Sequence, residues 1–134
     1  MKILLDTNVV LDVLLDREPF KTDSYGAMSK ALQEGHLLFI SASAATDIFY
    51  VLRKALGSKT EALANMQTFM KIVSFAKVDE DDIINAFSSR ITDFEDAVVD
   101  SVASSLKADL ILTRNAKDFK YARIKTLTPT DFLN

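Results

Sequence analysis

Short apolar runs alternate with longer amphipathic segments along the whole chain. A continuous apolar run of three to five residues predicts a strand that is buried on both faces, as in parallel sheets. The predicted strands are residues 3–5, 37–40, 72–75 and 109–113, with a further short edge strand at 124–127. Helical periodicity between them gives the strand–helix alternation of an α/β fold with a parallel sheet covered by helices on both sides.

Helix-boundary signals support this division of the chain. Gly35 and Gly57 follow the predicted helices 20–33 and 48–56, where glycine commonly ends a helix. Ser58 and Glu61 have the spacing of a capping box for the next helix. The acidic run 79–82 is interpreted as the first turn of a helix rather than as a metal site, because acids complement the helix dipole there.

Two finer expectations concern orientation and length. In the helix 20–33, the face formed by Tyr25, Met28, Ala31 and Leu32 is expected to point inward. Regular structure is expected to end at 128–129, after the edge strand.

Composition restricts the class of protein. The 134 residues, 49% of them hydrophobic, predict a single domain spanning 1–134. The absence of cysteine excludes disulfides and thiolate metal sites and fits a reducing, cytoplasmic location. The apolar opening is too short for a signal peptide or a membrane span. One histidine and three glycines exclude multi-histidine sites and glycine-rich phosphate loops, and the net charge of −3 gives no general affinity for nucleic acid.

Polar residues follow two of the predicted strands directly. Asp6 ends the first strand, and Thr113, Arg114 and Asn115 leave the fourth. Ligands of open α/β sheets bind at this carboxyl edge. A functional role for Asp6 is therefore favoured, although Asp6 and Thr7 could instead cap the helix that follows.

Other acids lie early in predicted helices. Asp47 and Asp96 can reach the same edge of the sheet as Asp6. Asp96 and Asp100 are four residues apart and share a helix face, where like charges repel unless solvent or a cation separates them. Asp93 can simply cap the helix that carries them.

The expected donors are all oxygen atoms. Asp6, Asp47 and Asp96 would supply carboxylates and Asn115 an amide, a set that suits Mg²⁺ or Mn²⁺ rather than zinc. A cation of this kind neutralises a phosphodiester and lowers the pKa of an attacking water. The sequence therefore predicts metal-dependent phosphate chemistry at the sheet edge.

Basic residues near the end of the chain fit such a substrate. Arg114, Lys117 and Lys120 lie among aromatic residues and are candidates for contacting RNA phosphates. The alternative is a solvated basic segment that balances the acids.

Three motifs together resemble the PIN-domain ribonucleases, over essentially the whole chain. The strand exit 3–9, with its Asp-Thr-Asn, is similar to the first motif of that family. The segment 93–103, which contains Asp-Ala, is similar to the central motif, and 111–119 is similar to the last. The resemblance implies a three-layer α/β/α Rossmann-like domain with four to five parallel strands, Mg²⁺- or Mn²⁺-dependent RNA cleavage and frequent homodimers. It also implies a VapC-type toxin held inactive by an antitoxin protein.

The resemblance assigns roles residue by residue. The metal-binding acids correspond to Asp6 and Asp96, and the residues that support the first acid correspond to Thr7 and Asn8. Asp47 lies where the family more often has Glu. Asn115 lies where many members have Asp and others have Asn. Further residues that could support the site are Thr113, Asp100 and Asp118.

We interpret the chain as a metal-dependent endoribonuclease, the toxin of a toxin–antitoxin pair. The rival interpretation is a non-catalytic PIN-like module that pairs with a protein or with RNA without cutting. The departures at Asp47 and Asn115 favour the rival. Titration with metal followed by incubation with RNA distinguishes the two.

Overall fold

The fold is built around one parallel sheet, seen in a computed structural model that describes all residues, 1–134. Its strands are β1 (Lys2–Leu5), β2 (Leu37–Ser41), β3 (Val73–Ala76), β4 (Leu110–Leu112) and β5 (Thr126–Leu127). They lie in the order β3-β2-β1-β4-β5, and every neighbouring pair is parallel. The predicted parallel sheet of four to five strands is confirmed, with five strands present.

The first strand lies at the centre of the sheet. β1 pairs with β2 on one side, where Leu5 is opposite Ile40, and with β4 on the other, where Leu5 is opposite Leu112. Ile3, Leu4 and Leu5 are at most 1% exposed. The unbroken apolar run at the start of the chain therefore reflects burial on both faces of the sheet.

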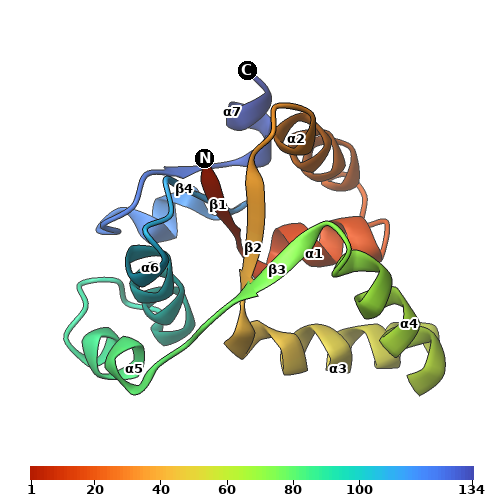
Figure 1. The fold of residues 1–134 in the computed structure, drawn as a ribbon, viewed down its shortest axis with the longest axis horizontal. Helices are drawn as coiled ribbons and strands as arrows, with labels where there is room; N and C mark the ends of the chain where they lie inside the picture. The colour runs from red at the N-terminus through yellow and green to blue at the C-terminus, as the bar shows by residue number, and fades with distance from the viewer.

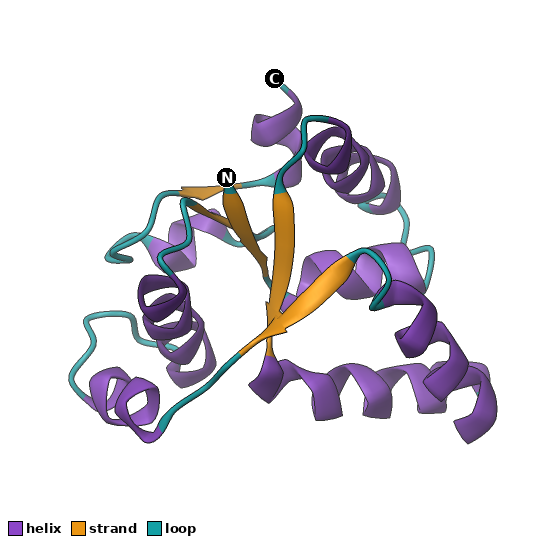
Figure 2. Ribbon diagram, viewed as in Figure 1, coloured by secondary structure: helices purple, strands orange, loops and turns teal.

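Helices cover both faces of the sheet and make three layers (Figures 1 and 2). One core packs under α1 (Thr7–Leu14), α2 (Lys21–Gln33), α3 (Ala45–Leu56), α4 (Lys59–Phe69) and α7 (Pro129–Leu133). The other packs under α5 (Glu80–Phe87) and α6 (Phe94–Leu106), at the left of Figure 1. Two short 3-10 turns, η1 (Ala42–Ala44) and η2 (Ala116–Phe119), follow β2 and β4. None of the helices combines the length and apolar character needed to cross a bilayer.

The helix boundaries agree with the signals in the sequence. Gly35 and Gly57 have φ of 79° and 67°, the left-handed conformation that glycine adopts readily at helix ends. The Ser58 hydroxyl accepts a hydrogen bond from the backbone N–H of Glu61. Asp79 caps α5 in a full capping box, so the acidic run does begin a helix.

Two of the finer expectations were wrong. The chain does not end its regular structure at residue 129, because Thr128 caps a last short helix, α7, whose first residue is Pro129. In α2, Met28 and Ala31 are buried as expected, but Tyr25 and Leu32 are exposed, Tyr25 by 60%. The buried face of α2 is shifted toward smaller side chains because α7 packs against this helix.

Candidate active site

Asp6 lies at the carboxyl end of the central strand and is held by three hydrogen bonds. Its Oδ1 accepts from the backbone N–H of Thr7 at 2.8 Å, and its Oδ2 accepts from Asn8 Nδ2 at 3.2 Å and from Thr113 Oγ1 at 2.6 Å. Asp6 also caps α1, so the two roles considered for it are compatible. A carboxylate has about four acceptor positions, so these contacts orient Asp6 and leave acceptor capacity for a ligand.

The residues that follow β1 and β4 are joined to one another by hydrogen bonds. Thr113 is fully buried, and its hydroxyl also accepts from the backbone N–H of Asn115 at 3.1 Å. The backbone N–H of Arg114 donates to Oδ1 of Asn8 at 3.3 Å. The polar residues after these two strands therefore form one network around Asp6, as the neighbouring positions of the strands require.

Asp96 reaches the same edge of the sheet from the first turn of α6. Asp93 is the N-cap, and its Oδ1 accepts from the backbone N–H of Asp96 at 3.0 Å. Burial raises the pKa of Asp96 to about 7, and the negative charge of Asp6 contributes next, followed by smaller contributions from the other nearby acids. A large share of Asp96 is therefore protonated near neutral pH when no cation is bound.

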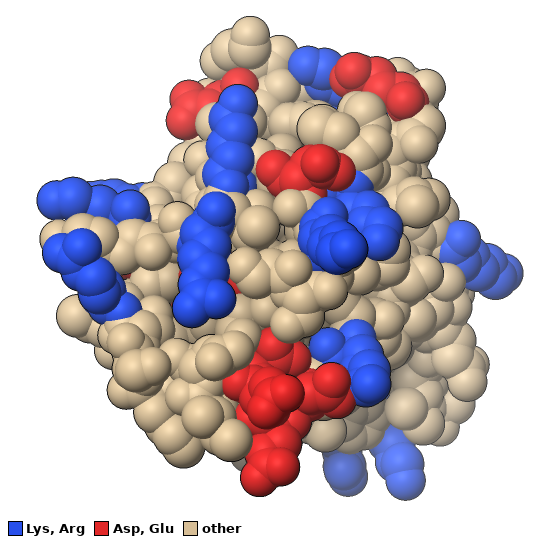
Figure 3. All heavy atoms as spheres, turned by 60° about the vertical axis from the view of Figure 1, so that its left-hand side comes forward, with Lys and Arg blue, Asp and Glu red and all other residues tan.

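These residues line one depression of about 300 Å³, which we call the acidic hollow. Its lining is Asp6, Thr7, Asn8, Leu11, Arg17, Asp93, Glu95, Asp96, Asn115 and Asp118. Arg17 is the one cationic residue among them. In Figure 3, Asp and Glu side chains gather at the lower edge of the molecule, toward which the strand arrows of Figure 1 point.

The pKa of Asp6 is also raised. Burial is the main cause, and the hydrogen bonds from Thr113 and from the backbone of Thr7 oppose it. Asp93 raises the pKa further, while Arg114 lowers it. The acidic hollow is therefore a region where negative charge is only partly compensated by the protein.

Asp47 does not line the acidic hollow, contrary to the expected convergence of four side chains. It lies in the first turn of α3, which begins after the 3-10 turn η1, and it lines another depression of about 220 Å³, the Asp47 hollow. Glu95 lines both hollows. The charge of Asp47 raises the pKa of Glu95, after the larger effect of burial.

Glu95 and Asp93 were not among the candidates chosen from the sequence. Both are exposed and occupy the start of α6, where acids are common as capping and dipole-complementing residues. The signal that could have found them is the density of acids in 93–96, since three acids in four residues exceed what a single helix cap requires.

Asp100 makes a structural hydrogen bond and is not part of the acidic hollow. It lies one turn after Asp96 on α6, is 5% exposed, and accepts from the backbone N–H of Arg123 at 2.9 Å. Burial raises its pKa, and backbone hydrogen bonds from Arg123 and Ile124 oppose that shift. Asp100 does not line the acidic hollow and ties the segment before β5 to α6.

The three basic residues predicted to contact RNA differ in how exposed they are. Lys117 and Lys120 are exposed and do not line the acidic hollow. Arg114 is largely buried: its Nε lies 2.8 Å from Oδ2 of the fully buried Asp12, and its guanidinium lies over the Phe20 ring at 3.9 Å. A side chain held in this way supports the loop after β4 rather than reaching freely into solvent.

The donor chemistry fits a hard divalent cation. The acidic hollow offers oxygen donors from its acids and amides, and the neighbouring acids raise the pKa of Asp96. No group of three or more Asp, Glu or His side chains is close enough to hold a metal ion by itself. Magnesium is commonly bound through one or two carboxylates, with waters and substrate phosphates completing its shell, and Asp6 and Asp96 fit that arrangement.

Comparison with protein families identifies the chain. A model of the PIN domain matches residues 2–117. The chain belongs to the PIN domain family. Comparison with curated protein sequences gives no match.

Several solved structures share this fold at low sequence identity. One similar structure is that of VapBC2 from Rickettsia felis bound to a DNA fragment from the VapBC2 promoter. It is 15% identical to this chain with a TM-score of 0.76, and the match covers 96% of this chain and 98% of that chain. FitAcB from Neisseria gonorrhoeae is 20% identical with a TM-score of 0.73 and the same coverage. Mycobacterium tuberculosis VapC20, a Sarcin-Ricin loop cleaving toxin, is 14% identical with a TM-score of 0.65, covering 92% and 98%. These likenesses establish a common fold.

Proposed function

We propose that this PIN domain is a Mg²⁺- or Mn²⁺-dependent endoribonuclease that hydrolyses phosphodiester bonds at the acidic hollow. The observation that carries the proposal is the convergence of Asp6 and Asp96, from opposite parts of the chain, in one depression where the pKa of Asp96 rises to about 7. Strongly perturbed carboxylates in a depression are typical of functional sites.

Asp6 and Asp96 would hold the cation, with Asn115 and Asp118 nearby in the same hollow. When bound, a divalent cation would neutralise charge on the phosphodiester and lower the pKa of water. Thr113, Asn8 and the Thr7 backbone keep the Asp6 carboxylate oriented for this task. Arg17, in the lining of the acidic hollow, is suited to contact a substrate phosphate.

Glu95 is the candidate proton acceptor. It lines the acidic hollow beside Asp96, and partial burial together with the charge of Asp47 raises its pKa above the ordinary value, which makes it a stronger base. In this proposal the Glu95 carboxylate removes a proton from the attacking water. Asp47 acts on the reaction through Glu95, and not as a direct ligand.

The toxin–antitoxin assignment is a further part of the proposal. It is supported by the similarity to VapBC2, to FitAcB and to VapC20, which is a Sarcin-Ricin loop cleaving toxin. On this basis we expect an antitoxin protein as partner, a homodimer, and action in the cytoplasm on RNA. Co-purification with the product of a neighbouring reading frame tests the partner.

The central test uses wild-type protein and Asp96→Asn with end-labelled single-stranded RNA in Mg²⁺, Mn²⁺ or EDTA. We expect cleavage by the wild type in either metal, none in EDTA, and a loss of about 100-fold or more in the variant. Thermal unfolding gives a second measure, because a bound cation stabilises the folded state and raises Tm. Metal should raise the Tm of the wild type more than that of Asp96→Asn.

A non-catalytic binding module is the second candidate. It is favoured by Asn115 in place of a further acid and by the location of Asp47 outside the acidic hollow. That candidate predicts that wild type and Asp96→Asn both bind RNA and that neither cuts it in any metal.

A further inference from the structure

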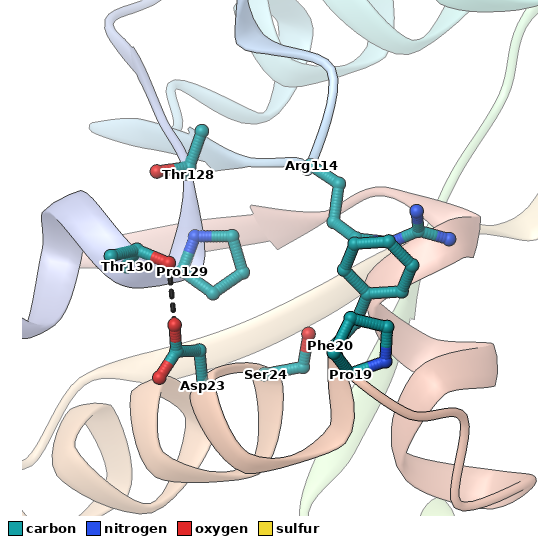
Figure 4. A pocket seen from close by; sticks show the side chains of 8 residues that line it. All are labelled: Pro19, Phe20, Asp23, Ser24, Arg114, Thr128, Pro129 and Thr130. Atoms are coloured by element: carbon teal, nitrogen blue, oxygen red, sulfur yellow. Dashed lines mark hydrogen bonds between the residues drawn. The ribbon is translucent and has the colours of Figure 1, made fainter.

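A second depression lies beside Arg114, outside the acidic hollow. It has a volume of about 190 Å³, and we call it the Phe20 cavity (Figure 4). It is lined by Pro19, Phe20, Asp23, Ser24, Arg114, Thr128, Pro129 and Thr130. The nuclease reaction proposed above uses none of these side chains.

At two places in the sequence, a residue that lines one depression lies next to, or two residues from, a residue that lines the other. Arg114 lines the Phe20 cavity, and the next residue, Asn115, lines the acidic hollow. Arg17 lines the acidic hollow, and Pro19, two residues later, lines the Phe20 cavity. Consecutive Cα atoms are about 3.8 Å apart, so the backbones of the two linings lie close together at these two points. This closeness puts the Phe20 cavity within reach of a polymer that is bound over the acids.

The walls of the Phe20 cavity suit a planar ring. In Figure 4 the rings of Phe20 and Pro129 stand on opposite sides of the hollow, with Ser24 and Asp23 of α2 along its lower side. Phe20 is 41% exposed although it is a large apolar side chain. One side of its ring is supported by the Arg114 guanidinium. Unpaired RNA bases commonly stack on aromatic rings and guanidinium planes of this kind.

The charges around the cavity argue against a phosphate as its ligand. The positive charge of Arg114 is already paired with the buried carboxylate of Asp12, which also accepts from Ser24 Oγ at 3.1 Å. Asp23 adds a further negative charge at the cavity. An anion would therefore find little uncompensated positive charge there.

The polar groups favour a ligand that donates hydrogen bonds. A carboxylate can only accept, and Asp23 uses one oxygen, Oδ2, to accept from Thr130 Oγ1 at 2.6 Å. Its other oxygen has acceptor capacity for a ligand. Adenine and cytosine carry a donating amino group at the position where uracil has the O4 carbonyl oxygen, and guanine carries an amino group at N2. Uracil has no amino group and donates only through its N3–H.

We propose that the Phe20 cavity binds one unpaired base of the RNA substrate, next to the phosphodiester that is cut, and that it prefers an amino-bearing base to uracil. This inference rests on the proposed ribonuclease function and adds a specificity site to it. In this proposal the Phe20 ring stacks on the base, and Asp23 accepts from the amino group of the base and so disfavours uracil.

The binding test uses Phe20→Leu, which keeps apolar volume and removes the aromatic face. Its matched control is Tyr25→Leu, which removes an exposed aromatic ring from α2 outside the cavity. Both are made in the Asp96→Asn background, and affinities for short oligo(A), oligo(C) and oligo(U) RNAs are measured by fluorescence anisotropy. We expect Phe20→Leu to weaken oligo(A) and oligo(C) binding about 5-fold or more, and to affect oligo(U) less. Tyr25→Leu should change none of the three.

The cleavage test maps cut sites in a randomised RNA with otherwise wild-type protein. We expect the wild type to disfavour uracil at one position beside the cut, and Phe20→Leu to lose that preference. Asp23→Asn keeps an oxygen for Thr130 but introduces a donor, so it should shift the preference toward uracil. If both variants cut every sequence equally slowly, or if Phe20→Leu binds RNA like Tyr25→Leu, the Phe20 cavity is not a base site. Failure of the wild type to cut any RNA would contradict the nuclease proposal and leave the anisotropy result standing.

Discussion

Thr113 Oγ1 donates a hydrogen bond of 2.6 Å to Oδ2 of Asp6, joining the ends of two neighbouring strands across 107 residues of sequence. Both side chains are buried, with Thr113 fully inaccessible and Asp6 6% exposed. A hydroxyl bonded to a carboxylate makes a stronger hydrogen bond than a neutral pair does. This bond lowers the pKa of Asp6 against the larger effect of burial.

The first prediction is that Thr113→Val impairs the site while it preserves the shape of the side chain. The variant removes one of the three hydrogen bonds to the buried Asp6 carboxylate and the acceptor of the Asn115 N–H. We expect a loss of about 1–3 kcal/mol in the free energy of unfolding and slower RNA cleavage. Denaturant unfolding and cleavage assays measure these effects. Thr113→Ser retains the hydroxyl and should recover most of both, and a valine variant equal to wild type would contradict the role.

The second prediction concerns pH and the metal-free protein. The folded state raises the pKa of Asp96 from 3.8 to about 7, so between about pH 4 and 7 the folded state binds a proton that the unfolded state has released. Stability must therefore fall as pH rises through that window. Because Asp96 is half exposed, we expect a loss of only about 1 kcal/mol, or a few degrees in Tm, between about pH 5 and 8.

The measurement is thermal unfolding in EDTA across this pH range. Other groups also titrate, so the informative quantity is the difference between wild type and Asp96→Asn. We expect Asp96→Asn to be nearly as stable as the wild type at the acidic end of the range and more stable at the alkaline end. Parallel curves for the two proteins would show that Asp96 has an ordinary pKa.

The third prediction ranks the acids of α3 and α6. Glu95 lines the acidic hollow, whereas Asp47 lies only in the Asp47 hollow. If Glu95 accepts a proton, Glu95→Gln should lower the cleavage rate about 100-fold or more and leave the metal-induced rise in Tm largely intact. Asp47→Ala should have a smaller effect on rate than Asp6→Ala. A Glu95→Gln variant with the wild-type rate would remove Glu95 from the mechanism.

The fourth prediction concerns the buried ion pair of Asp12 and Arg114. Asp12→Ala removes the partner of a largely buried guanidinium, and we expect a loss of about 3 kcal/mol in the free energy of unfolding. The double variant Asp12→Leu/Arg114→Met removes both charges and should recover much of that loss.

The matched control for this pair is Asp16→Ala. Asp16 pairs with Lys21 at 3.0 Å on the surface, where an ion pair contributes about 1 kcal/mol or less. Urea unfolding of the four proteins provides the comparison. Equal losses for Asp12→Ala and Asp16→Ala would mean that the Asp12–Arg114 pair contributes no more than a surface contact.

The sequence was sufficient for the parts of the molecule that depend on local pattern. Asp6 follows an unbroken apolar run, which identifies both a buried strand and its exit. The glycines at 35 and 57 identify helix ends, since few other residues adopt their backbone conformation readily. Periodicity carries no information on which strands are neighbours, so the order of the strands became known only from the structure.

The remaining features depend on tertiary packing. Asp47 and Asp96 are both acids early in a helix, yet Asp47, whose helix follows a 3-10 turn, lines a separate hollow. Asp100 lies one helical turn after Asp96, as a second metal ligand could, but it accepts a hydrogen bond from the backbone N–H of Arg123, 23 residues later. The position of Arg114 depends on Asp12, which by sequence is one more acid on a short helix. In each case the partner is distant in sequence, so local reasoning could not identify it.

The central position of β1 has a consequence for the protein during its own synthesis. The strand that carries Asp6 is synthesised well before its neighbour β4 and before Asn115 and Asp118, which complete the acidic hollow. Contacts across such a separation form late, since a long loop must close first. A ribosome-bound chain that has not yet released β4 contains Asp6 without its Thr113 hydrogen bond. Under the proposed mechanism the catalytic centre is therefore completed only after residues 110–118 have been synthesised and β4 has paired with β1, so a shorter nascent chain would be unable to cut.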